Sequence, residues 1–356
     1  MKTAIIGLPM VGKTSLFTIL TGVHQESRIG STAVRAGVAK VPDPRLDALA
    51  KLFEPPKITH AVVEYLDVPA VSKESLRDPA YVASLRVVDA FAHVLRVFGD
   101  ETVPHEHGSV DPMRDLQNVE TELVLSDLMV VEKRLERLDK DRKKVKNPEL
   151  DREAELLEKC KATLEQDIPL RELTLDADAE KRIRGFQFLS QKPILYVLNV
   201  GEEDAPRLHE NEEEFRKALG AKLNTAVAGV GGKIEAELAE LSREEASEYL
   251  VSYGLKESGL ERLISASYAL LGLMSFLTAG ETEVRAWTIP IGSTAVKAAG
   301  AIHSDFEKKF IRAEVVNWKS LVDLGGYPGV REKGLLRLEG KEYIVKDGDV
   351  LVIRHG

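Results

Sequence analysis

The feature that most constrains the fold is the stretch GLPMVGKT at residues 7–14, which follows an apolar run at residues 3–6 and opens a helix-like segment at residues 13–20. The spacing G-x4-G-K-T suits a backbone that wraps around phosphate oxygens, because glycines permit close approach and a helix N-terminus offers free N–H groups and a favourable dipole. The lysine of such a loop neutralises phosphate charge, and the hydroxyl after it is a ligand for Mg²⁺. The pattern therefore predicts a strand–loop–helix unit that cradles phosphate.

Further apolar runs at residues 62–66, 90–98, 193–200 and 225–230 alternate with polar, helix-like segments. Strands that alternate with helices are typical of βαβ units and a parallel sheet. The sequence thus predicts an α/β fold of the P-loop NTPase class, with its strands placed on both sides of an intervening segment.

That intervening segment has a helical period. Leucine and valine recur at mostly three- and four-residue spacing from residue 116 to 138, and a similar pattern runs from residue 150 to 168. Asn147-Pro148 separates the two patterns, so we predict two long helices folded back as a hairpin with this turn at the tip. Cys160 falls within the apolar seam and is interpreted as a small core residue.

The chain changes character again near residue 278. One helix is expected at residues 294–303, among short strands joined by turns such as Asp347-Gly348. The expected strands are residues 283–291, 310–316, 335–338, 342–345 and 350–354. The expected domains are an α/β domain at 1–114 and 191–277, a helical insertion at 115–190, and a C-terminal domain at 278–356.

Composition narrows the classes of protein. The 356 residues are 44% hydrophobic, which is enough to fill several cores, and no run approaches the roughly 20 apolar residues that a bilayer requires. The single cysteine excludes an internal disulfide, so we expect a cytoplasmic protein without a membrane or DNA partner. Whether the chain self-associates is left open.

The net charge of −9 hides a local excess of positive charge. Residues 133–146, at the far end of the predicted hairpin, hold eight basic and three acidic residues. One interpretation is a contact with ribosomal RNA, and the other is a solvated helical face with ion pairs four residues apart.

The metal-binding half of a nucleotide site is expected at the end of another strand of the sheet. Asp67 ends the run at 62–66, where GTPase-type proteins carry D-x-x-G, and an Asp at this place holds Mg²⁺. Here Ala70 replaces the glycine and Pro69 restricts the loop. Val71 has no polar group to orient an attacking water.

The base-recognition candidate is Asn199-Val200-Gly201-Glu202, after the run at 193–200. A guanine site has N-K-x-D, whose Asp accepts hydrogen bonds from the base. In this chain Val200 replaces the lysine and Glu202 the aspartate. Because an Asn amide pairs with the N6/N7 edge of adenine, the sequence favours adenine.

The order of these motifs resembles the YchF/Obg-like ATPases, a branch of the Obg-type translation-factor GTPases that prefers ATP. The resemblance covers essentially the whole chain and is most specific near the C-terminus. The matching stretches there include residues 278–288, 298–300, 302–308, 310–314, 338–345 and 347–350.

The resemblance implies an Obg-type G domain, an inserted coiled coil, a TGS-like β-grasp domain, ATP hydrolysis that requires Mg²⁺ and is stimulated by cations such as K⁺, and association with ribosomes. It also places His105 where relatives carry a histidine proposed to assist hydrolysis. The expected catalytic residues are therefore His105 and Lys13, which neutralises phosphate charge. Thr14 and Asp67 are the expected metal ligands. The expected nucleotide-binding residues are Leu8, Pro9, Met10, Val11, Gly12, Lys13, Thr14, Ser15, Asn199, Val200 and Glu202.

The chain departs from the family at several places. It lacks the glycine-rich stretch after D-x-x-G. Gly231-Gly232 replace a Ser-Ala pair in the last base-contacting loop. In the first switch segment, Ser31-Thr32 leave open which hydroxyl meets Mg²⁺. Three hypotheses remain: a slow ATPase, a nucleotide-binding ribosome adaptor with impaired hydrolysis, and a GTP-binding variant.

Overall fold

The computed structural model of the chain describes residues 1–23 and 34–356. These residues form two compact units. The first unit comprises Met1–Val38 and Glu64–Ala266, and the second comprises Ala39–Val63 and Ser267–Gly356. The hydroxyls of Ser31 and Thr32 lie outside the described residues.

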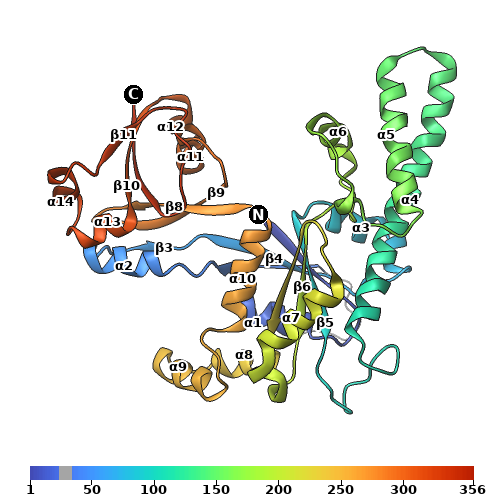
Figure 1. The fold of residues 1–356 in the computed structure, drawn as a ribbon, viewed down its shortest axis with the longest axis horizontal. Coiled ribbons are helices and arrows are strands. Elements are labelled where there is room, and N and C mark those ends of the chain that lie inside the picture. The colour runs from blue at the N-terminus through green and yellow to red at the C-terminus, as the bar shows by residue number, and fades with distance from the viewer. Residues whose placement is uncertain (24–33) are drawn as a thin grey trace. The chain divides into compact units, whose positions relative to one another are not determined.

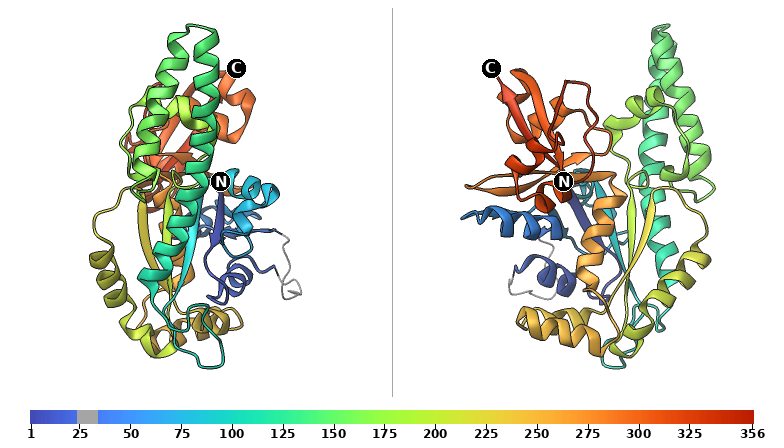
Figure 2. Two further views of the ribbon diagram at one scale, coloured as in Figure 1. Left: turned by 90° about the vertical axis from the view of Figure 1, so that its right-hand side faces the viewer. Right: turned by 60° about the vertical axis from the view of Figure 1, so that its left-hand side comes forward.

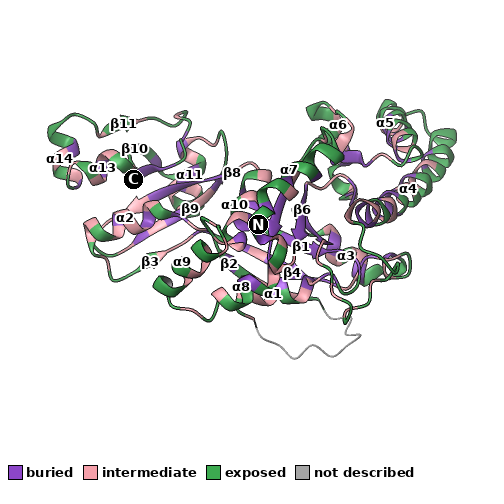
Figure 3. Ribbon diagram, turned by 60° about the horizontal axis from the view of Figure 1, so that its bottom comes forward, coloured by how far each residue is buried: buried purple, intermediate pink, exposed green. Residues whose placement is uncertain are grey.

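The first unit is built on a six-stranded sheet in the order β2-β4-β1-β5-β6-β7 (Figure 1). Strand β1 pairs in parallel with both β4 and β5, and parallel pairing continues to β6 and β7. Every residue of β5 and β6 is buried, as expected for central strands covered on both faces (Figure 3). The predicted parallel sheet is therefore confirmed for β4, β1, β5, β6 and β7, and β2 lies beside β4 at its edge. Its strands are β1 (Lys2–Ile6), β2 (Arg35–Lys40), β4 (Val62–Asp67), β5 (Ala90–Arg96), β6 (Ile194–Asn199) and β7 (Thr225–Val230).

Helices and short turns connect these strands. Because parallel strands share their direction, the loops that follow β1, β5, β6 and β7 emerge at one edge of the sheet, where ligands bind in open α/β sheets. The elements between these strands are α1 (Lys13–Thr21), η1 (Ser75–Arg77), α3 (Pro79–Arg86), η4 (Glu202–Arg207) and α7 (Leu208–Leu219). After β7 the chain forms α8 (Gly232–Leu238), α9 (Arg243–Ser252) and α10 (Gly259–Leu270).

A helical hairpin lies between β5 and β6 in the sequence. It consists of α4 (Pro112–Lys144) and α5 (Pro148–Leu164), which run side by side (Figures 1 and 2). Asp111 and Asn147 cap the two helices, each with proline as the first helical residue. Cys160 is buried in the seam, as interpreted from the sequence. The second helix ends at Leu164, four residues earlier than the spacing predicts, and η2 (Leu170–Glu172), α6 (Ala177–Ile183) and η3 (Arg184–Phe186) lead on to β6.

Buried polar contacts fix the base of α4 to the rest of the first unit. Glu120 on α4 accepts hydrogen bonds from Arg171 at 2.7 Å and from the Tyr196 hydroxyl of β6 at 3.1 Å. About two turns further along α4, Asp127 accepts the backbone N–H groups of Leu189 and Ser190 at 2.9 and 2.7 Å. Burial raises the pKa of Asp127 to about 6 despite these bonds. The hairpin is therefore anchored along α4.

The second unit contains a mixed six-stranded sheet in the order β11-β10-β12-β8-β9-β3. The expected domain boundary at 278 falls inside β8, and this unit begins at Ser267. Residues 39–63, expected in the α/β domain, belong to the second unit and carry α2 (Pro44–Phe53). The strands are β3 (Ile58–Thr59), β8 (Leu273–Ala279), β9 (Val284–Pro290), β10 (Phe310–Asn317), β11 (Arg337–Glu339) and β12 (Asp349–His355).

Two expectations for the C-terminal region are wrong. The structure has four short helices where one was expected, and residues 342–345 do not form a strand. Ile344 makes a single bridge to Thr294, and the Val345 N–H donates to the Ser293 carbonyl at 3.0 Å, so these residues line the turn before α11. The four helices are α11 (Ala295–Ile302), α12 (Ser304–Lys308), α13 (Trp318–Asp323) and α14 (Tyr327–Glu332).

Among the helices of the described chain, none combines the length and the apolar character needed to cross a membrane.

Candidate functional site

The glycine-rich loop joins β1 to α1 and has left-handed backbone at three positions. Gly7, Met10 and Gly12 have φ values of 145°, 60° and 96°. A Cβ atom on Gly7 would lie 2.7 Å from the Val94 carbonyl oxygen, and one on Gly12 would lie 2.5 Å from Asn199 Nδ2. Both positions therefore require glycine, for backbone conformation and for space.

The Lys13 side chain folds back over this loop. Its ammonium donates hydrogen bonds to the carbonyl oxygens of Leu8 at 2.6 Å and Gly7 at 3.1 Å. Burial lowers the pKa of Lys13 from 10.5 to about 8, and the carboxylates of Asp67 and Glu106 oppose that shift. A nearly buried cation held over a glycine-rich loop at a helix N-terminus is suited to binding an anion.

The two expected metal ligands lie next to each other. The Thr14 hydroxyl donates to Asp67 Oδ2 at 3.0 Å, and the Asp67 side chain is only 5% exposed. A hydroxyl and a carboxylate are the oxygen donors that Mg²⁺ takes in phosphate sites. The sequence did not predict that the Arg35 guanidinium of β2 also contacts both residues.

The segment after Asp67 is irregular up to residue 74 and then forms the short helices η1 and α3. Val71 is buried, and its N–H donates to the Gly7 carbonyl at 3.3 Å. The Tyr81 hydroxyl of α3 donates to the Pro69 carbonyl at 3.0 Å, and Asp78 caps α3. These contacts agree with the reduced freedom that Pro69 and the missing glycines predict.

Asn199 joins two loops of the site. Its Nδ2 donates to the Val11 carbonyl at 3.0 Å, and its Oδ1 accepts the Gly232 N–H at 3.2 Å. A Cβ on Gly232 would lie 3.0 Å from Asn199 Oδ1, so the glycine allows this close approach. Asn199, which the sequence predicts as a base contact, therefore also holds the glycine-rich loop against the loop after β7.

A cavity of about 540 Å³ opens beside Asn199, a size suited to a small ligand. It lies between the glycine loop and the loops after β5, β6 and β7. Glu202 and Val200 line it, together with Lys233 and Asp100. The remaining lining residues are Gly12, Ser15, Ile19, Phe98, Gly99, Val103, Asn199, Gly201, Glu203, Asp204, Gly232 and Ala236.

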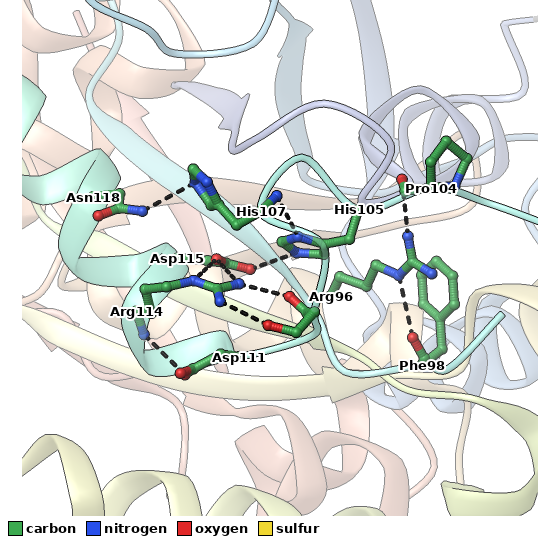
Figure 4. A network of polar contacts seen from close by, with 10 residues as sticks. Arg96, Phe98, Pro104, His105, His107, Asp111, Arg114, Asp115 and Asn118 are labelled. Carbon is green, nitrogen blue, oxygen red and sulfur yellow. Dashed lines mark hydrogen bonds and ion pairs between the residues drawn. The ribbon is translucent and has the colours of Figure 1, made fainter. Parts of the chain in front are cut away.

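His105 does not point its ring nitrogens into this cavity but is engaged elsewhere. Its Nε2 lies 2.8 Å from Asp115 Oδ2 on α4, and its Nδ1 accepts the His107 N–H at 3.1 Å (Figure 4). The His105 side chain is 6% exposed. The His107 ring contacts Asn118 at 3.1 Å, and the described residues contain no cluster of three or more metal-ligating side chains.

Arg96, which sequence reasoning missed, shapes the loop that carries His105. This buried residue ends β5, stacks on the Phe98 ring at 4.4 Å, and donates to the carbonyls of Phe98, Asp100 and Pro104 (Figure 4). One arginine therefore satisfies three carbonyls of this loop. The signal in the sequence was weak: a charged residue within an apolar strand.

The basic run at the hairpin tip is partly neutralised. Arg134 pairs with Glu153 at 2.7 Å and Arg142 with Asp151 at 2.6 Å, both across the hairpin. The other basic residues form no ion pair with a carboxylate within the described ranges. These are Lys133, Arg137, Lys140, Lys143, Lys144 and Lys146.

A parallel sheet with a glycine-rich loop and a buried lysine after its central strand defines a P-loop α/β protein. The family model YchF-GTPase_C, described as "Protein of unknown function (DUF933)", matches residues 273–356. The chain is 40% identical over 363 residues to "Ribosome-binding ATPase YchF" of Bacillus subtilis, which covers 99% of both chains. It therefore belongs to the YchF family.

Two further relatives support this assignment. The Haemophilus influenzae protein of the same name is 40% identical over 363 residues, covering 99% of this chain and 98% of the relative. The structure of the Schizosaccharomyces pombe YchF GTPase superposes with a TM-score of 0.85 at 29% identity, covering 99% of this chain and 97% of that one.

Proposed function

We propose that the protein binds ATP with Mg²⁺ at the glycine-rich loop, hydrolyses it slowly and associates with ribosomes. The observation that carries the proposal is the Lys13 ammonium, held within 3.1 Å of the loop carbonyls beside Thr14 and Asp67. The name of the curated relatives, a ribosome-binding ATPase, supports the choice of nucleotide and partner.

In this proposal each part of the site has one task. The loop N–H groups and Lys13 bind the phosphates, and the adjacent cavity, lined by Val200 and Glu202, takes the base. Thr14 and Asp67 hold Mg²⁺, which neutralises phosphate charge when bound. Asn199 fixes the glycine loop against the loop after β7. The proposed domains are an Obg-type G domain, an inserted coiled coil formed by α4 and α5, and a TGS-like domain in the C-terminal part of the second unit.

The site also favours slow turnover. Val71 is apolar and buried, and both ring nitrogens of His105 are already bonded. His105 therefore has to leave Asp115 before it can assist an attacking water. These contacts support the second candidate function, a nucleotide-binding ribosome adaptor with impaired hydrolysis.

Calorimetric titration with ATP and with GTP, combined with phosphate release with and without ribosomes and K⁺, tests the proposal. We expect ATP to bind at least about tenfold more tightly than GTP, since Glu202 stands in place of aspartate. We expect slow phosphate release that ribosomes or K⁺ accelerate. Tight binding without turnover under every condition supports the adaptor, and tighter binding of GTP supports the GTP-binding variant.

ATP affinity is expected to fall as the pH rises above about 8. The pKa of Lys13 is lowered to about 8 in the free protein, and phosphate charge favours the protonated ammonium, so binding takes up a proton above this pH. Affinity should be flat just below about pH 8 and fall by up to about tenfold per pH unit above it. Titration with a fluorescent ATP analogue measures the effect.

The matched control for this pH dependence is Lys13→Arg, because a guanidinium stays charged throughout this range. Its affinity should not vary above pH 8. If the parent protein binds equally well at about pH 7.5 and pH 9.5, the lowered pKa of Lys13 does not govern binding.

A further inference from the structure

Arg35 lies at the two groups that the proposed function assigns to Mg²⁺. Its Nη2 donates to Asp67 Oδ2 and lies 3.2 Å from Thr14 Oγ1. Thr14 donates to the same Asp67 oxygen at 3.0 Å. One guanidinium nitrogen therefore contacts both expected metal ligands.

The guanidinium is positioned by the fold. Arg35 is the first residue of β2, a strand in the same sheet as β4, which ends at Asp67. The guanidinium carbon lies 5.8 Å from the ring centroid of Phe17, a fully buried residue of α1. The Arg35 side chain is 18% exposed. Sheet and helix together direct this cation towards Asp67.

The charges around Asp67 mean that its contact with Arg35 affects the binding of a divalent ion. Asp67 is the carboxylate that both Arg35 and Lys13 face, and an arginine cannot lose its proton to make room for another cation. A divalent ion at Asp67 has to displace the guanidinium from Oδ2 and approach two fixed positive charges. Since one carboxylate cannot fully satisfy both cations in a buried place, Arg35 and Mg²⁺ compete.

We propose that Arg35 is a built-in cation that occupies the place of the divalent ion at Thr14 and Asp67, so that Mg²⁺ binds in competition with it. This inference rests on the proposed function, because nucleotide is what brings Mg²⁺ to the site. It makes nucleotide binding less dependent on Mg²⁺ and makes the Mg²⁺-bound form sensitive to the Mg²⁺ concentration. Arg35 is thus a positioning residue that regulates metal entry.

The test compares the parent protein with Arg35→Gln in titrations with a fluorescent ATP analogue at varied MgCl₂. We expect the half-saturating Mg²⁺ concentration to fall at least about tenfold in Arg35→Gln, because a competing charge has gone. In EDTA, we expect this variant to bind the analogue more weakly than the parent. An Mg²⁺ requirement that is unchanged or increased overturns the proposal.

Two further variants separate competition from a general change of charge or fold. Arg207→Gln removes the same charge from an exposed side chain and should leave the Mg²⁺ titration unchanged. Arg35→Lys keeps a cation but has no planar fork, so we expect an intermediate Mg²⁺ requirement. If Arg35→Lys behaves as Arg35→Gln does and Arg207→Gln shifts equally, the effect is not competition at Asp67.

A nucleotide-free measurement distinguishes failure of this inference from failure of the proposed function. Thermal unfolding is followed with MgCl₂ alone for the parent and for Arg35→Gln. We expect Mg²⁺ to raise the unfolding temperature of Arg35→Gln more than that of the parent, even if neither protein binds the ATP analogue. Equal responses to Mg²⁺ overturn the competition, whereas absence of analogue binding with unequal responses overturns only the nucleotide assignment.

Discussion

Replacing Lys13 by alanine is expected to weaken ATP binding by at least about 100-fold. The variant loses the two charge-assisted hydrogen bonds that the ammonium is proposed to make to phosphate oxygens. Each such bond contributes about 1.5–3 kcal/mol, and 1.4 kcal/mol corresponds to a factor of ten. The ammonium is held at 2.6 and 3.1 Å from the loop carbonyls, so it is already placed where phosphate oxygens would converge. Calorimetric titration with ATP–Mg²⁺ measures the loss.

The same variant should not be less stable than the parent. Burial lowers the pKa of Lys13 from 10.5 to about 8, which corresponds to a cost of about 3 kcal/mol for keeping the ammonium charged in the fold. The sign follows from the direction of the shift: the cost is fully present below pH 8 and declines as the pH rises towards 10.5. Removing the ammonium removes this cost, so the thermal unfolding temperature should be equal or higher at neutral pH.

Lys2→Ala is the matched control for Lys13→Ala. Lys2 lies at the start of β1, its side chain is 46% exposed, and it pairs with Glu64 at 3.4 Å. Exposed pairs of this kind contribute little, so ATP affinity should stay within about twofold of the parent. If Lys13→Ala binds ATP as well as Lys2→Ala does, the glycine-rich loop is not the nucleotide site.

The sequence predicts those parts of the site whose conformation is determined by residues close to them in the sequence. The loop at residues 7–14 follows from glycine spacing between an apolar run and a helix, and the hydrogen bonds of Lys13 to the Gly7 and Leu8 carbonyls lie within it. Arg35 was missed because its contacts depend on where β2 enters the sheet. His105 lies in the loop between β5 and α4, and the direction of its ring depends on Asp115, ten residues away on α4.

In the fold, too, the elements determined by nearby residues are predictable and those that depend on distant contacts are not. The hairpin is predictable because α4 and α5 are long, periodic and capped by Asp111 and Asn147. Helices α13 and α14 are six residues each, and Gly325-Gly326 and Pro328 lie at or near their junction, so no helical period can be recognised. Residues 342–345 are apolar enough for a strand, but their hydrogen bonds go to the turn before α11.

The second large effect is expected at the base of the hairpin, where Arg171→Met should lower the free energy of unfolding by about 3–5 kcal/mol. The Arg171 and Glu120 side chains are 0% and 3% exposed and lie 2.7 Å apart. Without the guanidinium, the Glu120 carboxylate keeps only the Tyr196 hydroxyl and stays buried as an uncompensated charge. The Lys192 carbonyl also loses the Arg171 Nε donor at 2.9 Å.

Urea denaturation followed by far-UV circular dichroism measures this loss, because α4 and α5 contribute much of the helix of the first unit. The two tryptophans of the chain, Trp287 and Trp318, both lie in the second unit, so their fluorescence follows that unit separately. The first-unit transition should move to lower urea in Arg171→Met. An exposed control, Arg207→Met, should change stability by no more than about 0.5 kcal/mol.

A double variant decides whether the buried charge itself is the cause. Arg171→Met with Glu120→Gln removes the carboxylate charge but keeps an oxygen that accepts the Tyr196 hydroxyl, so it should recover more than half of the lost stability. If the double variant is as unstable as Arg171→Met alone, lost packing and the Lys192 carbonyl explain the effect instead. Recovery means that Arg171 is needed chiefly because Glu120 is charged, and that this ion pair fixes α4 to η2 by making any other arrangement of the hairpin costly.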